Sequence, residues 1–578
     1  MKDQVRQLVA DAIARLKQQG DFVEVDPEQI VVERTRDASH GDFTTNIAMK
    51  LASRQGCPAR ELAGRIVEAM PGSAILERAE VAGPGFINLF VDSGAYIGMI
   101  DTIRSAGSEY GKSDSGSGLR VLVEFVSSNP TGPLHVGHGR GAAYGDALVR
   151  ILSFAGYDAH AEYYVNDAGR QMDILTVSVW IRYLEALGLP SRFPENGYRG
   201  GYIRNIARQL NESYGSRFAR DDPALFEALP GDTDAGVDEL VRRCKEALGE
   251  GYETVFNAAC GAMVDDIRKD LGEFGVVFDR WFHESSLVGS GDIDASLARL
   301  DENGYLYEQD GATWFRSTDF GDDKDRVVVR ANGSKTYFAS DIAYHYNKAE
   351  RQYDRIINVF GADHHGYTKR IEASFQAMGN PPERLEFLVV QFAILYRGDE
   401  KVSMSTREGE FVPLRELREE AGNDAARFFY VLRRSDQHME FDLELAKSQS
   451  AENPVYYIQY AHARICSVFE QAREKGLGTP NTQAPDYRLL TEEREMELLK
   501  VLARFPETVK LAAANRAPHQ VAYYLRDLAH LFHAYYNAHP FLSSRDELRL
   551  ARLGLIDAVR VVIANGLGIL GVSAPSSM

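Results

Sequence analysis

Residues 124–147 read EFVSSNPTGPLHVGHGRGAAYGDA and join two segments of opposite character. Before them lies a β-rich apolar run, Arg120–Val126, and after them apolar side chains recur at helical spacing over residues 148–154. A strand, a Gly/Pro turn and a helix start, in this order, direct a helix N-terminus at a bound anion. His135 and His138 lie at that start, where imidazoles can donate hydrogen bonds to phosphate oxygens.

Gly137, between the two histidines, leaves room for a flat ring or a close backbone approach. Taken alone, the HVGH motif also fits an ordinary turn with two surface histidines. A zinc site is disfavoured, because no cysteine lies nearby and two histidines three positions apart lack a third ligand. We therefore expect no metal site of the protein's own here.

Bulk composition limits the class of protein. A chain of 578 residues with 44% hydrophobic and 26% charged residues suits a multidomain globular enzyme. The net charge of −19 argues against a general nucleic-acid coat protein but leaves room for a local basic face. Cys57, Cys244, Cys260 and Cys466 form no C-x-x-C pair, which suits a reducing cytoplasm. No long apolar run predicts a signal peptide or a membrane span.

The chain divides into three predicted domains. Residues 1–112 suggest an α+β module, with a helix over 43–51 and strands over 30–33 and 82–91, followed by a Ser/Gly/Asp-rich linker from Ser113 to Gly118. From residue 446 to 578 strand signals vanish, and long amphipathic helices predict an all-α domain.

Between these, residues 113–445 predict an α/β nucleotide-binding domain. Residues from about 174 to 270 are helical in pattern and interrupt the βαβ rhythm as an insertion. Strands predicted over 325–330 and 354–360 support a second half of the same fold, and the latter runs into GADHHG. Polar residues directly after a strand lie where open α/β sheets bind ligands.

Several motifs in the same order resemble a known family. HVGH after SSNPTGPL resembles the HIGH motif of class I aminoacyl-tRNA synthetases, and residues 124–139 as a whole are similar to arginyl-tRNA synthetases. The resemblance extends to GDDKDRVVV (321–329), TYFASDIAYH (336–345), NPVYYIQYAHARICS (453–467) and the terminal LGVSAP. It implies a Rossmann-like class I catalytic core with a helical insertion, an N-terminal α+β tRNA-contacting domain and an all-helical anticodon-binding domain.

The resemblance also implies a reaction. ATP and Mg²⁺ would activate L-arginine to arginyl-adenylate, and the arginyl group would pass to the 3′ end of tRNA(Arg), with release of AMP and diphosphate. His135 and His138 would contact the ATP phosphates and stabilise the transition state, with Gly137 leaving room for the adenine. Positioning and charge stabilisation supply most of such catalysis. The family further suggests a cytoplasmic monomer that needs bound tRNA before it activates arginine.

The family's arginine-binding positions fall on several motifs of this chain. They are Glu124 and Asn129 for the α-amino end, Tyr337 and Asp341 for the guanidinium, and Asp363 or His364 to complete the pocket. Acidic groups suit a planar, permanently charged guanidinium. Without the family motifs, Asp341 would read as a solvated or capping carboxylate, and Asn129 as a turn residue before proline.

One motif departs from the class. The K-M-S-K-S loop reads Lys401-Val-Ser-Met-Ser-Thr-Arg-Glu-Gly409, so that Ser403 and Thr406 replace both motif lysines. By position, Met404 and Ser405 remain as ATP-binding residues. Lys401 and Arg407 are the nearest sources of positive charge, and we hypothesise that Arg407 carries more of it. Either can also be an ordinary solvated charge.

Contacts to tRNA need only a local basic and aromatic surface. By family position we expect Tyr460 and Arg464 to face the anticodon, and Phe86 and Asn88 to face the tRNA elbow. Further basic candidates precede the helical domain, namely Arg427, Arg433 and Arg434. Core packing for Tyr460, and a half-buried strand position for Phe86, are the structural alternatives.

Two other classes of function remain to be weighed. The first is another class I enzyme, such as a cysteinyl or glutaminyl synthetase, or a related nucleotidylyltransferase. A cysteinyl synthetase would be expected to show zinc-ligand cysteines, and no suitable cluster is present. A nucleotidylyltransferase would have no use for about 130 helical residues at the C-terminus. A catalytically dead RNA-binding relative is supported only by the altered K-M-S-K loop.

Overall fold

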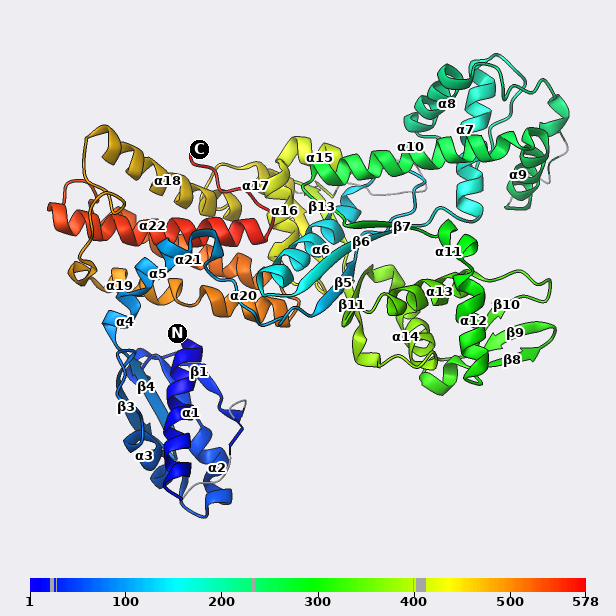
Figure 1. The fold of residues 1–578 in the computed structure, drawn as a ribbon. Helices are drawn as coiled ribbons and strands as arrows, with labels where there is room; N and C mark the ends of the chain where they lie inside the picture. Colours follow the sequence, from blue (N-terminus) through cyan, green and yellow to red (C-terminus); the bar gives the residue numbers. More distant parts are fainter. Residues whose placement is uncertain (21–24, 27–28, 228, 230–233, 399, 402–411) are drawn as a thin grey trace.

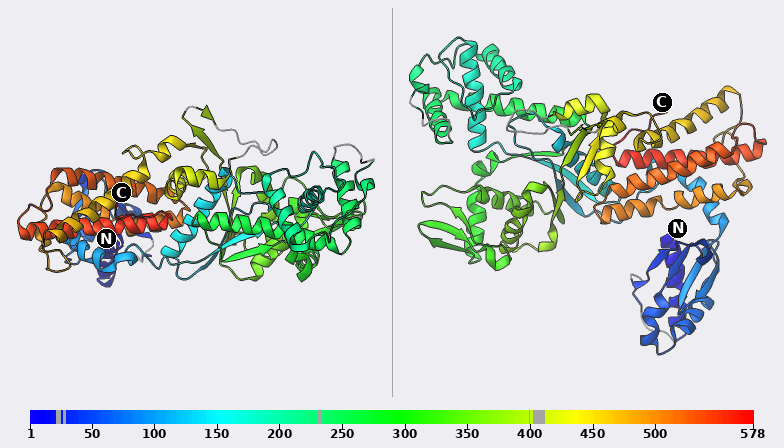
Figure 2. Two further views of the ribbon diagram at one scale, coloured as in Figure 1. Left: turned by 90° about the horizontal axis from the view of Figure 1, so that it is seen from above. Right: turned by 180° about the vertical axis from the view of Figure 1, so that it is seen from behind.

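The structure is a computed structural model that describes residues 1–20, 25–26, 29–227, 229, 234–398, 400–401 and 412–578, with the side chains of 38 and 363–365 left out. Figure 1 shows the chain as an elongated molecule. The N-terminal module projects from one side, and long C-terminal helices lie at the opposite end from the helices of residues 170–273. Figure 2 shows the same arrangement from above and from behind. No helix among the described residues is long and apolar enough to cross a membrane.

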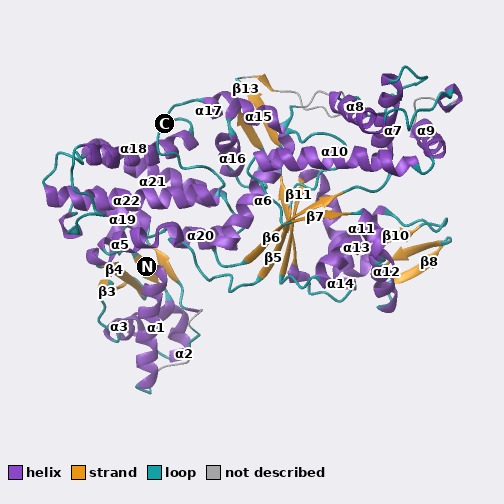
Figure 3. Cartoon of the chain, turned by 45° about the horizontal axis from the view of Figure 1, so that its top comes forward, coloured by secondary structure: helices purple, strands orange, loops and turns teal. Residues whose placement is uncertain are grey.

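A parallel sheet forms the centre of the molecule (Figure 3). Its strands, in spatial order, are β12 (Leu385–Val390), β11 (Arg355–Gly361), β5 (Arg120–Glu124), β6 (Asp158–Val165) and β7 (Arg280–His283). The chain runs from β5 outward to β7 and then returns to β11 on the other side of β5. The order therefore reverses between β5 and β11, which is where open α/β sheets bind ligands.

Helix α6 (Val136–Phe154) covers one face of this sheet. Val121, Leu122 and Val123 of β5 are at most 1% exposed, as expected of a parallel strand buried on both faces. A Cβ atom at Gly145 would lie 2.2 Å from the ring of Phe125. The small residues of α6 thus allow the close helix–sheet contact that fixes the direction of its N-terminus.

Helices fill most of the chain between β6 and β7. They are α7 (Arg170–Ala186), α8 (Gly201–Tyr214), α9 (Asp234–Leu248) and α10 (Gly251–Glu273). After β7 come α11 (Ser285–Ser290), α12 (Asp292–Glu302) and an antiparallel sheet of β8 (Leu306–Gln309), β9 (Ala312–Phe315) and β10 (Arg326–Val329). The strand predicted over 325–330 exists, but it pairs with β9 instead of joining the parallel sheet, so that part of the prediction was wrong.

Helix α13 (Tyr337–Glu350) then leads into β11, and α14 (Thr368–Ala377) joins β11 to β12. The next elements are β13 (Ala393–Arg397), β14 (Glu400–Lys401), α15 (Leu414–Ala421), α16 (Asn423–Leu432), β15 (Met439–Asp442) and α17 (Leu443–Lys447). The remaining long helices are α18 (Pro454–Glu474), α19 (Glu493–Leu502), α20 (Phe505–Ala514), α21 (His519–Ala538) and α22 (Asp546–Ile569).

The N-terminal module packs helices on an antiparallel sheet of order β1-β2-β4-β3. Its elements are α1 (Lys2–Gln18), β1 (Val32–Arg34), β2 (Phe43–Thr45), α2 (Ile47–Gln55), α3 (Ala59–Glu68), β3 (Leu76–Ala82), β4 (Phe86–Val91), α4 (Ser93–Ile97) and α5 (Met99–Ala106). The helix predicted from Phe43 begins only at Ile47, because residues 43–45 pair with β4. The strand predicted over 82–91 is β4 alone, since Gly83 and Gly85 turn the chain back from β3 with positive φ.

Ion pairs join this module to the C-terminal helices. Glu507 accepts Lys2 Nζ at 2.9 Å and Arg34 Nε at 3.0 Å, both from the start of the chain. Arg104 Nε lies 3.0 Å from Asp557 of α22. The two segments are therefore held together by contacts across more than 400 positions of sequence.

Candidate active site

A cavity of about 1620 Å³ opens at the reversal point of the parallel sheet. Its walls come from the ends of β5, β6 and β11, the start of α6, the start of α13, and the segment 195–202 between α7 and α8. Both predicted halves of the site, the HVGH motif and the start of α13, line this one cavity.

The backbone is strained where β5 enters the cavity. Val126 and Ser127 have φ of 68° and 42°, a region that β-branched residues such as valine rarely adopt. This turn brings Ser127 Oγ to Glu124 Oε1, to which it donates at 2.9 Å, while Oγ accepts from the Tyr164 N–H at 3.1 Å. Backbone strain at a strand end therefore fixes one oxygen of Glu124.

His135 and His138 cap α6 together. Nδ1 of His135 accepts from Gly137 N at 3.1 Å, and Nδ1 of His138 accepts from His135 N at 3.2 Å. Both Nδ1 atoms are acceptors, so each neutral ring carries its proton on Nε2. Burial lowers the pKa of His135 and, with the neighbouring His135 ring, lowers the pKa of His138 to about 3. The motif thus presents two neutral imidazole donors, with ring centroids 3.7 Å apart, beside a helix N-terminus.

Gly137 lines the cavity and also lies beside the ring of His135. A Cβ atom there would lie 2.8 Å from Cε1 of His135, so the space beside the glycine is occupied by that ring. The glycine is therefore required for the capping geometry of His135.

The start of α13 supplies an acidic face. Thr336 caps the helix through Oγ1, which accepts from Ala339 N at 3.4 Å, so Tyr337 and Asp341 share one face as predicted. Tyr337 is 59% exposed and lines the cavity. Burial, together with the neighbouring carboxylates Glu284 and Glu124, raises the pKa of Asp341 to about 7.

A further acid in the cavity had not been predicted. Glu284 follows β7 directly, is 6% exposed, and lines the cavity with Asp341. Burial raises the pKa of Glu284, and Asp167 adds to the shift. The buried Glu284 and the partly buried Asp341, both with raised pKa values, form a site that a cation would stabilise. Its position after a strand was the available sequence signal.

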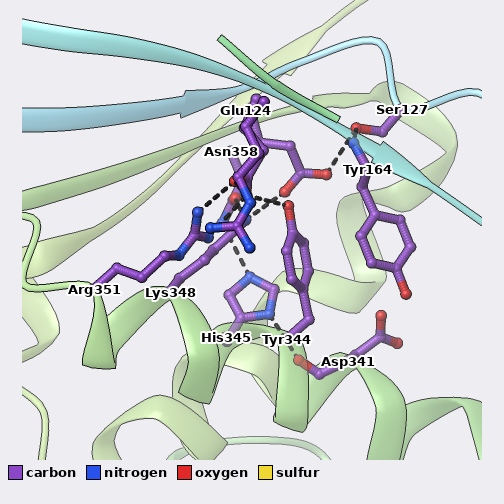
Figure 4. A network of polar contacts seen from close by, with 11 residues as sticks. Glu124, Ser127, Tyr164, Asp341, Tyr344, His345, Lys348, Arg351 and Asn358 are labelled. Atoms are coloured by element: carbon purple, nitrogen blue, oxygen red, sulfur yellow. Dashed lines mark hydrogen bonds and ion pairs between the residues drawn. The ribbon is translucent and has the colours of Figure 1, made fainter. Parts of the chain in front are cut away.

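Glu124, at the end of β5, pairs with a buried lysine of α13 (Figure 4). Lys348 Nζ, with a fully buried side chain, donates to Glu124 Oε2 and to Asn358 Oδ1, the latter at 2.6 Å. Asn358 Nδ2 faces His345 Nε2 at 3.2 Å, and His345 Nδ1 lies 2.9 Å from the carbonyl oxygen of Asp341. Sequence analysis had not singled out Lys348, His345 or Asn358.

Asn129 also lines the cavity, and its Nδ2 donates to Gln171 Oε1 of α7 at 2.9 Å. The adjoining loop is covered by the segment 195–202, where the Tyr202 hydroxyl donates to the carbonyl of Thr131 at 2.8 Å. The helices between β6 and β7 therefore contribute directly to one wall of the site.

Several predicted residues lie elsewhere or outside the described part of the chain. The backbone of Asp363 and His364 belongs to a 3-10 turn, Ala362–Tyr367, directly after β11, but their side chains are not described. Met404, Ser405 and Arg407 lie outside the described residues. Lys401 is exposed and pairs with Tyr396 in the β13–β14 hairpin.

The predicted tRNA-facing residues occupy two separate surfaces. The Arg464 guanidinium lies 4.7 Å from the ring centroid of Tyr460 and 4.4 Å from that of Tyr536. In the N-terminal module Phe86 is 37% exposed, whereas Asn88 is only 7% exposed. Phe86 is thus the accessible member of that pair.

Arg427 was expected on a basic surface, and the structure contradicts this. Its side chain is buried, pairs with Asp146 of α6, and donates to the Phe274 carbonyl at 2.9 Å. Arg434 pairs with Asp436 at 2.6 Å and remains exposed. Arg427 therefore ties α16 to α6 and is unavailable to a phosphate.

Three family models match the chain in order. Residues 3–91 match the arginyl tRNA synthetase N terminal domain, residues 100–196 and 218–464 match the tRNA synthetases class I (R) catalytic domain, and residues 458–578 match the DALR anticodon binding domain. Together with the parallel sheet, its reversal point and the HVGH helix start, these matches define a class I aminoacyl-tRNA synthetase.

Full-length relatives identify the family within this class. The chain is 56% identical to the arginine–tRNA ligase of Thioalkalivibrio sulfidiphilus and 53% identical to that of Halorhodospira halophila, each over 100% of both chains. It therefore belongs to the arginyl-tRNA synthetase family. A Campylobacter jejuni chain assigned as an arginyl-tRNA synthetase has a TM-score of 0.75 at 31% identity, covering 84% of this chain and all of that one. Thermus thermophilus arginyl-tRNA synthetase shares the fold over both whole chains, with a TM-score of 0.73 at 24% identity.

Proposed function

We propose that this chain ligates arginine to tRNA(Arg) in the cavity between β5 and β11, with the HVGH motif on the ATP and the acids of α13 and β7 on the arginine. One observation carries the proposal: neutral imidazole donors at a helix N-terminus share a single cavity with two carboxylates of raised pKa. The first arrangement suits phosphates and the second suits a guanidinium.

Arginine would bind with its guanidinium between Asp341 and Glu284, with Tyr337 at the side, and with its α-amino group near Glu124 and Asn129. The raised pKa of Asp341 supports this orientation, because a bound guanidinium would stabilise the ionised carboxylate. Asp363 or His364 would complete this pocket, since both directly follow β11.

Activation would proceed by in-line attack of an arginine carboxylate oxygen on the α-phosphorus of ATP. The bond from phosphorus to the diphosphate oxygen breaks, and diphosphate leaves. The Nε2–H groups of His135 and His138 would donate to phosphate oxygens on which charge develops. A terminal ribose hydroxyl of tRNA(Arg) then attacks the adenylate carbonyl carbon, and AMP leaves with its phosphate oxygen.

Mg²⁺ would enter with ATP, since it is usually held by substrate phosphates and one or two carboxylates. Glu416 lines the cavity near Pro413, the β-bridge partner of His135, and is a carboxylate of the kind that would hold it there. Gly137, Met404 and Ser405 would contact the nucleotide, with Lys401 and Arg407 as sources of positive charge.

We assign tRNA recognition to both ends of the chain: residues 1–112 through Phe86, and residues 446–578 through Tyr460 and Arg464. Residues 113–445 would hold the catalytic domain with its helical insertion at about 174–270. A cytoplasmic monomer that activates arginine only with tRNA bound is part of the same proposal.

Aminoacylation with purified chain, L-arginine, ATP, Mg²⁺ and tRNA(Arg) tests the function. Arginylated tRNA is the expected product, and failure to form it with active tRNA would refute the proposal. Diphosphate exchange measured with and without tRNA tests the order of events. Full exchange without tRNA would remove the tRNA requirement while leaving the ligase function intact.

A further inference from the structure

Lys348 occupies the centre of a polar network beneath the cavity (Figure 4). Its three ammonium hydrogens have three partners: the carboxylate of Glu124, Asn358 Oδ1 at 2.6 Å, and the face of the Tyr344 ring, whose centroid lies 4.1 Å from Nζ. Burial lowers the pKa of Lys348, and the carboxylates of Glu124 and Glu162 oppose that shift. A buried ammonium with every hydrogen placed has a single orientation.

The direction of every hydrogen bond from Lys348 toward Asp341 follows from the ends of the network. Lys348 is only a donor, so it must bind the amide oxygen of Asn358, which leaves Asn358 Nδ2 to donate to His345 Nε2. The backbone carbonyl of Asp341 is only an acceptor, so His345 must donate to it from Nδ1. Both ends require the same tautomer of His345, and burial lowers the pKa of that ring so that it stays neutral.

The other arm of the network fixes Glu124. Oε2 accepts from Lys348 and Oε1 accepts from Ser127, which is itself held by the Tyr164 N–H. The carboxylate therefore cannot rotate without breaking a bond at each oxygen. Its position at the cavity wall leaves its remaining lone pairs for a ligand.

We propose that Lys348 is a positioning residue that orients Glu124 for the α-ammonium group of arginine and links that end of the pocket to Asp341 at the guanidinium end. The proposal rests on the proposed function, in which Glu124 receives the α-amino group. Lys348, three positions from His345 and seven from Asp341, lies on the same face of α13 as both. One helix thus sets both ends of the amino-acid site.

A neighbouring ion pair provides a matched comparison. Arg351, one turn further along α13, binds Glu162 of β6 with Nη2 at 2.9 Å from Oε1. This pair also ties α13 to the sheet, but Glu162 is absent from the cavity wall. A purely structural role for Lys348 would therefore be shared by Arg351, whereas a role in orienting Glu124 would not.

The experiment compares three ligands in Lys348→Met and Arg351→Met. The ligands are L-arginine, agmatine, which lacks the carboxylate, and 5-guanidinopentanoate, which lacks the α-amino group. Agmatine and 5-guanidinopentanoate are measured as inhibitors of aminoacylation. In Lys348→Met we expect the KM of L-arginine and the Ki of agmatine to rise about 10- to 100-fold, as for loss of a charge-assisted hydrogen bond. The Ki of 5-guanidinopentanoate should stay at its wild-type value, and kcat should change less than KM.

Arg351→Met should lower the melting temperature without this selectivity among ligands. If Lys348→Met folds poorly, the double variant Lys348→Met with Glu124→Gln removes the unpaired carboxylate, and it should bind L-arginine no more weakly than Glu124→Gln alone, because Lys348 acts through Glu124. Equal weakening of all three ligands, or unchanged arginine binding, would overturn the role of Lys348 while wild-type arginylation still supports the proposed function. A wild type that binds 5-guanidinopentanoate as tightly as L-arginine would instead refute the role of Glu124, and this inference with it.

Discussion

The hydroxyl of Tyr367 donates a hydrogen bond to Oδ2 of Asp341 in the wall of the cavity. This bond lowers the pKa of Asp341 against the larger effect of burial, which raises it to about 7. The ionisation of this one carboxyl therefore falls within the range in which the enzyme would work. Arginine binding must compete with a proton there.

The KM for arginine should rise as pH falls through 7, because protonated Asp341 cannot pair with a guanidinium. The binding-competent fraction predicts a rise of about tenfold between pH 8 and pH 6. Tyr367→Phe removes the bond that favours the ionised form, so the rise should begin at a higher pH. Steady-state aminoacylation at varied arginine and pH measures both. A KM that stays flat over this range in both proteins would contradict the raised pKa.

Asp341→Asn should stabilise the ligand-free protein at pH 8. The folded-state pKa of Asp341 is raised, so its contribution to stability is fully present below the unfolded value and is lost as pH rises through 7. The shift corresponds to a penalty on the order of 4 kcal/mol at pH 8, and Asn avoids the charged form. Urea unfolding at pH 8 and pH 5 should show a gain that shrinks at the lower pH. Saturating arginine should stabilise the wild type alone, and an Asn variant less stable at pH 8 would exclude this account.

His135 has two separable roles, since it both caps α6 and lines the cavity. His135→Ser keeps a good N-cap but is too short to reach a phosphate, whereas His135→Ala loses both. We expect kcat to fall about 10²- to 10³-fold in each variant. Only the Ala variant should also lose about 1 kcal/mol of unfolding free energy. Equal stability of the two variants would argue against the capping role, and an unchanged kcat against the catalytic one.

The source of positive charge on the altered K-M-S-K loop remains a prediction, since residues 402–411 lie outside the described chain. We expect Arg407→Ala to reduce adenylate formation more than Lys401→Ala, because Arg407 flanks the loop core. Single-turnover adenylate formation in the presence of tRNA ranks the two. Loss of activity in Lys401→Ala with an unaffected Arg407→Ala would reverse the assignment.

Arg464 lies over the rings of both Tyr460 and Tyr536, which pre-organises a flat, charged surface. Tyr460→Ala should raise the KM for tRNA about 10- to 100-fold by removing a stacking surface, while Tyr460→Phe should change it little. The KM for arginine should be unaffected in both. Arg464→Ala should weaken tRNA binding and reduce its dependence on salt. Wild-type tRNA binding in Tyr460→Ala would place the anticodon surface elsewhere.

Local sequence patterns predicted those parts of the fold and site that depend on nearby residues. The β5–turn–α6 unit follows from its change of periodicity, and Tyr337 with Asp341 follows from helical spacing. The strand β10 was predicted, but its sheet was not, because pairing with β9 is set by tertiary contacts. Family motifs, and not periodicity, assigned the roles of the site residues.

The missed residues owe their surroundings to distant parts of the chain. A lysine within a helical pattern reads as solvent-facing, whereas Lys348 is buried and meets Glu124 across 224 positions of sequence. Glu284 follows β7, a strand with a single buried residue that gives no apolar run. For Gly137, the sequence indicated that a residue without a side chain was needed, but it did not indicate that the His135 ring would lie beside it.

The ion pair between Arg34 and Glu507 also has a consequence for synthesis, because its partners lie 473 positions apart. At about 5–20 residues per second, a ribosome needs roughly 25–95 s to pass from one to the other. During that interval the docking face of the N-terminal module stays uncovered. Besides apolar contacts such as that of Tyr110 with Phe505, this face carries the charged side chains of Lys2, Arg34 and Arg104, which favour water over other nascent chains. The ion-pair partners on this surface thus keep that part of it hydrated until the C-terminal helices emerge and complete the contact.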